Sequence, residues 1–325
     1  MSNKSVGLKN IAFALNISVN TVSRALRDCS DISKSTKELV KQKANELGYK
    51  PKNFSHFIKR EGQFLFGIIL PNKVELETQL LLNILNQELP KKEMDYIFIP
   101  SDSLNKSIIK QCQSLKVDGI ISLVGVDDDV ISLIKRNNFP IVLLGLQTNQ
   151  KGLSYVCVNN EKVGQMAAKH LTNFHKVRKM ICIREYNCTN SNIRIDAFQE
   201  YVSKNLTRST ILVLEPKDIN PEFIKHISDG YYGIFAYNDS QAYQILRELK
   251  EKSYDIRSQY PDFHIIGVGA LHNKIVGLSD LTSLDVDYKM LVVKAIDILR
   301  KKIISPNSRS KNVLLEPKLY IRKSL

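Results

Sequence analysis

From Phe64 onward, short β-rich runs alternate with helical stretches. The runs are FLFGIIL (64–70), YIFI (96–99), GIISLV (119–124), IVLLG (141–145), KMICI (179–183), ILVL (211–214), GIFAY (233–237) and FHIIGV (263–268). Helical patterns lie among them at 160–174, 191–205 and 238–252. This alternation predicts an α/β fold with parallel strands. About ten strands fit two doubly wound lobes better than one, with a ligand cleft at the carboxyl ends of the strands.

A different pattern precedes this region. Residues 8–15 carry an apolar stripe at helical spacing, as expected for a short amphipathic helix. Ser18 is placed to cap a second helix over 19–27, and Ser33 a third helix ending near Leu47. Pro51 then opens a basic connector. We therefore predict a compact three-helix head with a helix-turn-helix.

The predicted domain division follows from these patterns. It comprises a head at 1–50, a hinge at 51–62 and a two-lobed, periplasmic-binding-protein-like domain at 63–325. Within that domain we expect an N-lobe of about 63–158 and 287–311, and a C-lobe of about 159–286 and 312–325.

The net charge of +14 is unevenly distributed. Residues 1–60 contain 12 Lys and Arg against 4 Asp and Glu, whereas the middle of the chain is nearly neutral. A basic N-terminal module indicates a polyanionic partner at that end, because each phosphate contact releases counterions. Solvated surface charge is the alternative from charge alone.

The second helix would carry the DNA-reading residues, because its N-terminus enters the major groove in a helix-turn-helix. Val19 suits a thymine methyl, Asn20 adenine, and Arg24 guanine. Thr21 and Ser23 suit phosphate oxygens. An ordinary polar surface helix is the competing interpretation.

The run SVNTVSRAL, the closing LGYKP and the later segments HIIGVG, LTSLDVDYKML and LLEPKLYIRKS resemble the lactose and galactose repressor (LacI/GalR) family. The resemblance implies a homodimer that binds a near-palindromic operator in double-stranded DNA. It also implies a hinge that contacts DNA through Lys52 and Ser55, with Ile58 as an apolar wedge in the minor groove. Lys52 and Ser55 depart from the usual Asn and Ala of the family.

The same resemblance implies an effector site at Arg194 and Asn238. Both side chains suit a carbohydrate-like ligand, such as a sugar or sugar phosphate. Acidic residues common in the family are replaced by Gly145 and Gly269. These replacements are also compatible with an acidic ligand or with none.

Other classes receive little support. The sequence has no nucleophile elbow, phosphate loop or metal-ligand spacing, so we expect neither an enzyme nor a cofactor or metal. A solute-binding receptor would need a signal peptide, which the N-terminus lacks, and we expect a cytoplasmic, nucleoid-associated protein without a membrane span. Control of the same regulator by a protein corepressor stays open.

Overall fold

The computed structural model describes most of the chain. Described are residues 7–26, 31–47, 64–137, 139–174, 179–186, 188–206, 208–219, 223, 230, 233–251, 263–271, 281–306 and 308–322.

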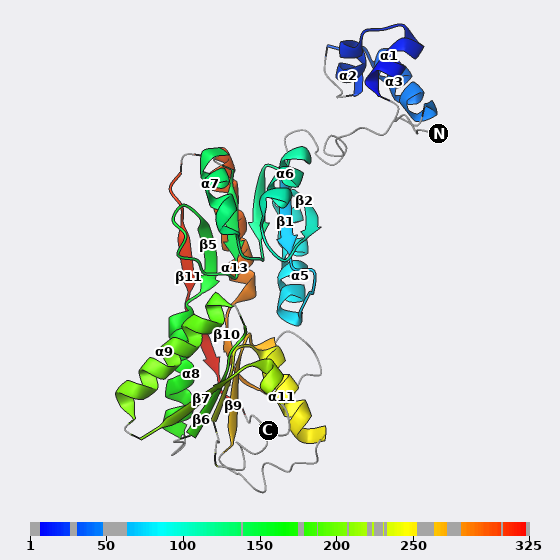
Figure 1. The fold of residues 1–325 in the computed structure, drawn as a ribbon. Helices are drawn as coiled ribbons and strands as arrows, with labels where there is room; N and C mark the ends of the chain where they lie inside the picture. The colour runs from blue at the N-terminus through cyan, green and yellow to red at the C-terminus, as the bar shows by residue number, and fades with distance from the viewer. Residues whose placement is uncertain are drawn as a thin grey trace.

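Three short helices form the head: α1 (Leu8–Leu15), α2 (Val19–Leu26) and α3 (Lys34–Glu46) (Figure 1). Asn16, with a left-handed φ of 50°, ends α1. The Ser18 hydroxyl accepts a hydrogen bond from the Thr21 N–H at 2.9 Å, and the Ser33 hydroxyl accepts one from the Thr36 N–H at 3.2 Å. These caps satisfy backbone donors that a helix N-terminus leaves open. The buried apolar core of the head comprises Ile11, Ala12, Val22, Ala25, Val40 and Ala44.

Two six-stranded sheets form the body. The first sheet contains, in spatial order, β11 (Asn312–Leu315), β5 (Ser154–Val158), β4 (Ile141–Leu144), β3 (Gly119–Ser122), β1 (Leu65–Leu70) and β2 (Asp95–Pro100). The second contains β12 (Lys318–Tyr320), β10 (Thr282–Asp285), β9 (His264–Val268), β8 (Gly233–Ala236), β6 (Lys179–Ile183) and β7 (Thr210–Leu214). The described pairings are parallel except for β10 with β12. The predicted fold class, a helix-turn-helix head with a two-lobed doubly wound domain, is confirmed.

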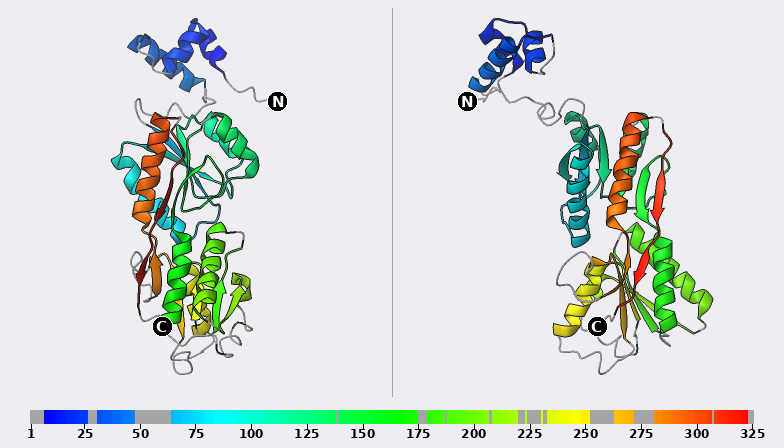
Figure 2. Two further views of the ribbon diagram at one scale, coloured as in Figure 1. Left: turned by 90° about the vertical axis from the view of Figure 1, so that its left-hand side faces the viewer. Right: turned by 180° about the vertical axis from the view of Figure 1, so that it is seen from behind.

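Helices connect the strands in both lobes. The N-lobe, defined here by the first sheet, contains α5 (Leu76–Lys91), α6 (Lys106–Ser114) and α7 (Asp128–Asn137). The C-lobe, defined by the second, contains α8 (Asn160–Phe174), α9 (Thr189–Asn205), the 3₁₀ turn η1 (Pro216–Asp218) and α11 (Asp239–Glu251). Helix α13 (Tyr288–Ile304) follows a C-lobe strand but packs on α5 and on strands β3 to β5 of the N-lobe (Figures 1 and 2).

One predicted domain boundary is wrong. We expected the C-lobe to resume at residue 312, but β11 (312–315) pairs with β5 of the N-lobe, Asn312 opposite Tyr155 and Leu315 opposite Val158. The chain enters the second sheet only afterwards, at β12. Because β11 and β12 are both short and only two residues separate them, their sequences do not show which sheet each joins.

A close helix crossing fixes the position of α9 against α8. A Cβ atom on Gly164 of α8 would lie 2.1 Å from the carbonyl oxygen of Arg194 on α9. Glycine therefore permits an approach that any other residue would prevent. The crossing therefore fixes the position of Arg194 on α9 relative to α8.

No described helix combines the length and the apolar character needed to span a bilayer.

Candidate functional sites

The N-terminus of α2 is exposed and its opposite face is anchored. Val22 and Ala25 are fully buried in the head core, whereas Val19 is 41% exposed and Asn20 is also exposed. A helix held in this way presents its first residues to an external partner with little freedom to rotate. The structure thus leaves Val19 and Asn20 exposed at the start of α2.

The other predicted contact residues of α2 have local partners. The Thr21 hydroxyl is hydrogen-bonded to the Ser18 hydroxyl at 2.8 Å, and Ser23 lies partly exposed. Arg24 pairs with Asp31 at 2.7 Å, and this hydrogen bond lowers the pKa of Asp31. Asp31 thus orients the Arg24 guanidinium, although both side chains remain accessible to solvent.

The three predicted hinge contacts, Lys52, Ser55 and Ile58, lie outside the described residues.

A cavity of about 710 Å³ lies between the lobes. Its walls include residues that follow the carboxyl ends of strands in both sheets, such as Pro71 after β1, Gly145 after β4, Glu185 after β6 and Asn238 after β8. Such a volume is typical of small-molecule sites, and doubly wound sheets place those sites at this edge. Both predicted effector residues, Arg194 and Asn238, line the cavity.

Arg194 is held by two neutral acceptors. Its Nε donates to Asn160 Oδ1 at 2.8 Å, and its Nη1 donates to the carbonyl oxygen of Tyr237. Asn160 in turn donates to Asn190 Oδ1 at 3.2 Å, and Asn190 donates to the Gly145 carbonyl oxygen at 2.7 Å. The chain of bonds connects the C-lobe helices to an N-lobe loop, so Arg194 both faces the cavity and braces the lobes.

Asn238 caps α11. Its Oδ1 accepts a hydrogen bond from the Gln241 N–H at 2.7 Å, as an N-cap residue does. The oxygen is therefore committed to the helix, and the amide NH₂ is the group of this side chain best suited to contact a ligand.

Asp239, the next residue, stabilises the interior of the C-lobe. It is fully buried, accepts from the Ser283 hydroxyl at 2.6 Å and accepts from the Leu271 N–H at 2.8 Å. Its Oδ1 lies so close to Gly267 that a Cβ there would be 2.2 Å away. A buried carboxylate with several donors is a structural anchor.

The backbone conformation favours glycine at the two positions where the resemblance led us to expect acidic residues. Gly145 has a φ of 79° and Gly269 a φ of 134°, both in the region that disfavours other side chains. A Cβ on Gly269 would also lie 2.9 Å from the Tyr288 hydroxyl. Carboxylates line the cavity at Glu77 and Glu185 instead, and neither residue was predicted as a site residue.

Glu77 makes a direct contact between the lobes. Both carboxylate oxygens lie 3.0 Å from the Ser240 hydroxyl, which donates to them, and Glu77 Oε1 lies 3.4 Å from the Ser240 N–H. Glu77 belongs to α5 of the N-lobe and Ser240 to α11 of the C-lobe. We call this pair the interlobe contact.

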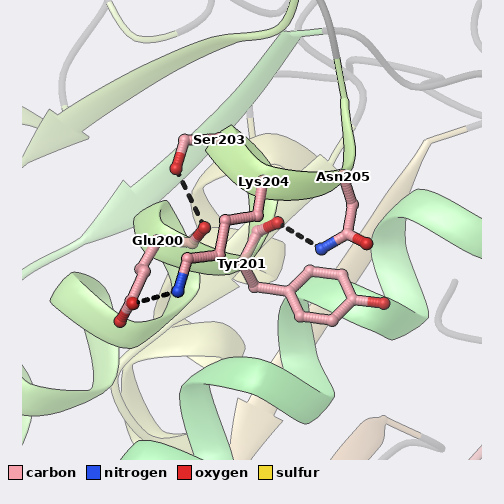
Figure 3. Close-up of polar contacts among 5 residues, drawn as sticks. All are labelled: Glu200, Tyr201, Ser203, Lys204 and Asn205. Carbon is pink, nitrogen blue, oxygen red and sulfur yellow. Dashed lines mark hydrogen bonds and ion pairs between the residues drawn. The ribbon is translucent and has the colours of Figure 1, made fainter.

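Substitution Ser240→Ala should weaken the interlobe contact by about 1 kcal/mol, because it removes the hydroxyl donor to a half-buried carboxylate. We expect a larger radius of gyration for the ligand-free body in small-angle X-ray scattering. Ser203→Ala is the control, since the Ser203 hydroxyl donates only to the backbone of its own helix, at Glu200, far along α9 (Figure 3). Equal radii for Ser240→Ala and wild type would show that the contact does not hold the lobes.

The interlobe contact should also respond to pH. Burial raises the pKa of Glu77 above its ordinary value of 4.5, and the nearby carboxylate of Glu75 acts in the same direction, whereas the hydrogen bonds from Ser240 act in the opposite direction. The net rise means that protonation favours the buried state of this carboxylate, so the contact is most stable at low pH and its stability declines as pH rises through the raised pKa. The radius of gyration should fall as pH is lowered from neutral through that pKa, and Glu77→Gln should abolish that change. A pH response unaltered by Glu77→Gln would assign it to another group.

Glu185 faces Tyr237 across the cavity wall. Burial, followed by a hydrogen bond from the phenol to Glu185, raises the pKa of Tyr237. The phenol is therefore a neutral donor at every physiological pH. Among the described residues, no group of three or more His, Cys, Asp and Glu side chains could hold a metal ion.

Two family models match this chain, one in the head and one in the later part of the body. Residues 7–52 match the bacterial regulatory proteins of the lacI family, and residues 168–325 match the periplasmic binding protein-like domain. The transcriptional regulator RafR of Escherichia coli is 31% identical over 147 residues, which cover 43% of this chain and 44% of RafR. The repressor PurR of Mannheimia succiniciproducens is 22% identical over 98% of each chain.

Among solved structures, the lac repressor dimer bound to operator and the anti-inducer ONPF is similar in fold. Its TM-score is 0.70, with 18% identity over 99% of each chain. RafR and PurR are both described as helix-turn-helix transcriptional regulators, and the head of this chain matches the family model of such proteins. The lacI-family match therefore covers the head, and the periplasmic binding protein-like match covers the later part of the body.

Proposed function

We propose that this protein is a repressor that binds a near-palindromic operator as a homodimer and is controlled by a small molecule between its lobes. One observation carries the proposal: a chain with an exposed α2 N-terminus also contains a cavity of about 710 Å³ lined by both lobes. Val19, Asn20 and Arg24 would read base edges, and Thr21 and Ser23 would contact phosphates.

A ligand in this cavity would act by changing the relative position of the lobes. Arg194 and Asn238 belong to the C-lobe, whereas Gln147 and Glu77 belong to the N-lobe, and all four line the cavity. A molecule that contacts both groups favours one lobe arrangement over another. A coupling free energy of about 1 to 3 kcal/mol between ligand and operator is enough for a useful switch. A carbohydrate-like ligand fits the amide and guanidinium donors.

The hinge would transmit that change to DNA. We expect residues 51–62 to contact the operator centre through Lys52 and Ser55, with Ile58 as an apolar wedge that kinks the minor groove. Ile58→Gly should reduce operator affinity and operator bending together, because the wedge would be missing. Fluorescence transfer between the ends of a labelled operator measures the bend. An unchanged bend would reject the wedge role of Ile58.

The repressor proposal is tested by retention of genomic DNA. Purified protein is incubated with fragmented DNA from its source at near-physiological salt, and the retained fragments are sequenced. We expect a few fragments that share one palindrome, and transcription from the neighbouring promoters should fall when the protein is present. Uniform retention would contradict sequence reading, and increased transcription would contradict a repressor.

A further inference from the structure

The charges that line the interlobe cavity are unbalanced. Four carboxylates and two cations contribute to the described wall: Glu75, Glu77, Asp102, Glu185, Lys73 and Arg194. Lys73, Glu75 and Asp102 are exposed at the rim, whereas Glu77, Glu185 and Arg194 are partly buried. Both the rim and the interior therefore carry an excess of one negative charge, which a ligand would meet on entering.

The one interior cation does not remove this excess. Arg194 donates to Asn160 and to the Tyr237 carbonyl oxygen, so two of its donor groups serve the protein scaffold. An anionic ligand would have to compete for the remaining donors of Arg194 while approaching Glu185 and Glu77. Such like-charge proximity is costly where solvent is largely excluded.

Helix N-termini do not reverse the balance either. The N-terminus of α11 already faces Glu77 through the Ser240 N–H, and α5 carries Glu77 in its own first turn. Helix α9 begins beside the cavity without an acidic residue in its first turn. Its N-terminus contributes only about half of one positive charge, less than the excess of the carboxylates.

Two tyrosine side chains share the cavity wall with these carboxylates. Tyr237 and Tyr288 both line the cavity. The pKa of each hydroxyl is raised, first by burial and then by carboxylates, Glu185 for Tyr237 and Glu77 for Tyr288. Both phenols are therefore neutral and leave the excess of carboxylates in place, so the wall is complementary to a cationic group.

We infer that the effector carries a positively charged group, an ammonium or a guanidinium, which lies against Glu185 and Tyr237. The inference rests on the proposed function of the cavity and specifies its ligand class. Hydroxyl or other polar groups on the same molecule would pair with the Asn238 amide and with Gln147, which also line the cavity. Phosphorylated and carboxylated compounds are disfavoured.

Matched small molecules that differ only in charge test this inference. One set comprises glucosamine, glucose and glucose 6-phosphate; the other comprises cadaverine, 1,5-pentanediol and glutarate. Each probe is added to the full-length protein at about 10 mM, a concentration that detects millimolar affinity by thermal shift. We expect only the cationic member of a set to raise the melting temperature. Equal or greater stabilisation by a neutral or anionic member, or none by either cation, would overturn the inference.

Variants that remove one carboxylate charge test whether Glu185 binds the cationic probe. Glu185→Gln keeps an acceptor for the Tyr237 hydroxyl but removes the negative charge, so affinity for the cationic probe should fall at least about tenfold. Glu200→Gln is the matched control, because Glu200 lies near the end of α9, the helix that follows Glu185 in the chain, and pairs with Lys204 at 2.5 Å (Figure 3). Cation binding that survives Glu185→Gln would remove Glu185 from the site and contradict the proposed geometry.

Retention of genomic fragments by the same preparations distinguishes failure of the ligand proposal from failure of the repressor proposal. Specific DNA retention without cation binding would overturn the ligand class and leave the repressor proposal intact. Cation binding without specific DNA retention would contradict the repressor proposal instead.

Discussion

Replacing Gly164 with alanine is expected to lower the free energy of unfolding by about 3 kcal/mol or more. The new Cβ would lie 2.1 Å from the Arg194 carbonyl oxygen and 3.0 Å from the Cβ of Ala197. A backbone oxygen cannot rotate away, so α8 and α9 would have to separate. The higher helix propensity of alanine returns only about 1 kcal/mol, which is too little to offset that separation.

Gly125→Ala is the matched control for this prediction. A Cβ atom at Gly125 would have no neighbouring atom within 4 Å. The free energy of unfolding of Gly125→Ala should therefore differ from wild type by less than about 1 kcal/mol. Calorimetry and denaturant titration of the full chain measure both variants. Similar melting temperatures for Gly164→Ala and wild type would show that the helices can separate at little cost, and Arg194 would not depend on their crossing.

Arg24→Ala is expected to weaken operator binding by about 5- to 150-fold while binding to random duplex changes much less. Arg24 lies one turn beyond the exposed start of α2, and its pairing with Asp31 at 2.7 Å orients the guanidinium. A bidentate contact with guanine requires this fork of donors. Fluorescence anisotropy with operator and scrambled duplexes at one salt concentration measures both affinities.

Two companion variants distinguish charge from geometry at this position. Arg24→Lys keeps the charge but loses the fork, so it should retain binding to random duplex and lose operator preference. Asp31→Asn removes the carboxylate that orients the guanidinium and one negative charge near the DNA, so it should strengthen binding to random duplex and reduce operator preference. Equal losses on operator and random DNA for Arg24→Ala would reduce Arg24 to a phosphate contact.

The head and the alternation of strands were predictable because their signals are local. The α1 stripe, the Ser18 and Ser33 caps and the buried Val22 can be inferred from neighbouring residues, and the structure confirms them. Strands β5 and β10 were not identified, since SYVCV and TSLD are short and contain polar residues. The assignment of β11 to a lobe failed because sheet membership depends on partners distant in the sequence.

Only the cavity residues that belong to motifs of the family resemblance were predicted. Arg194 and Asn238 are predicted by the resemblance, whereas Asn190 and Glu185 of the cavity wall, and Asn160, which accepts a hydrogen bond from Arg194, are not. Their contacts join residues 30 or more positions apart, and no local pattern reports them. A usable signal did exist for Glu77 and Ser240, because each follows a β-rich run and begins a helix. Carboxyl ends of parallel strands meet at one edge, so such residues converge there.

Operator binding requires that the head reads DNA sequence, and the ratio of two dissociation constants tests this directly. The dissociation constant is measured for a duplex carrying the retained palindrome and for a scrambled duplex of equal length and composition, at near-physiological salt. Specific regulators bind their sites at least about 10³ times more tightly than unrelated DNA, and we predict a ratio of that size. A ratio within about threefold would mean that only phosphates are contacted, and would contradict the account of this protein as an operator-binding regulator.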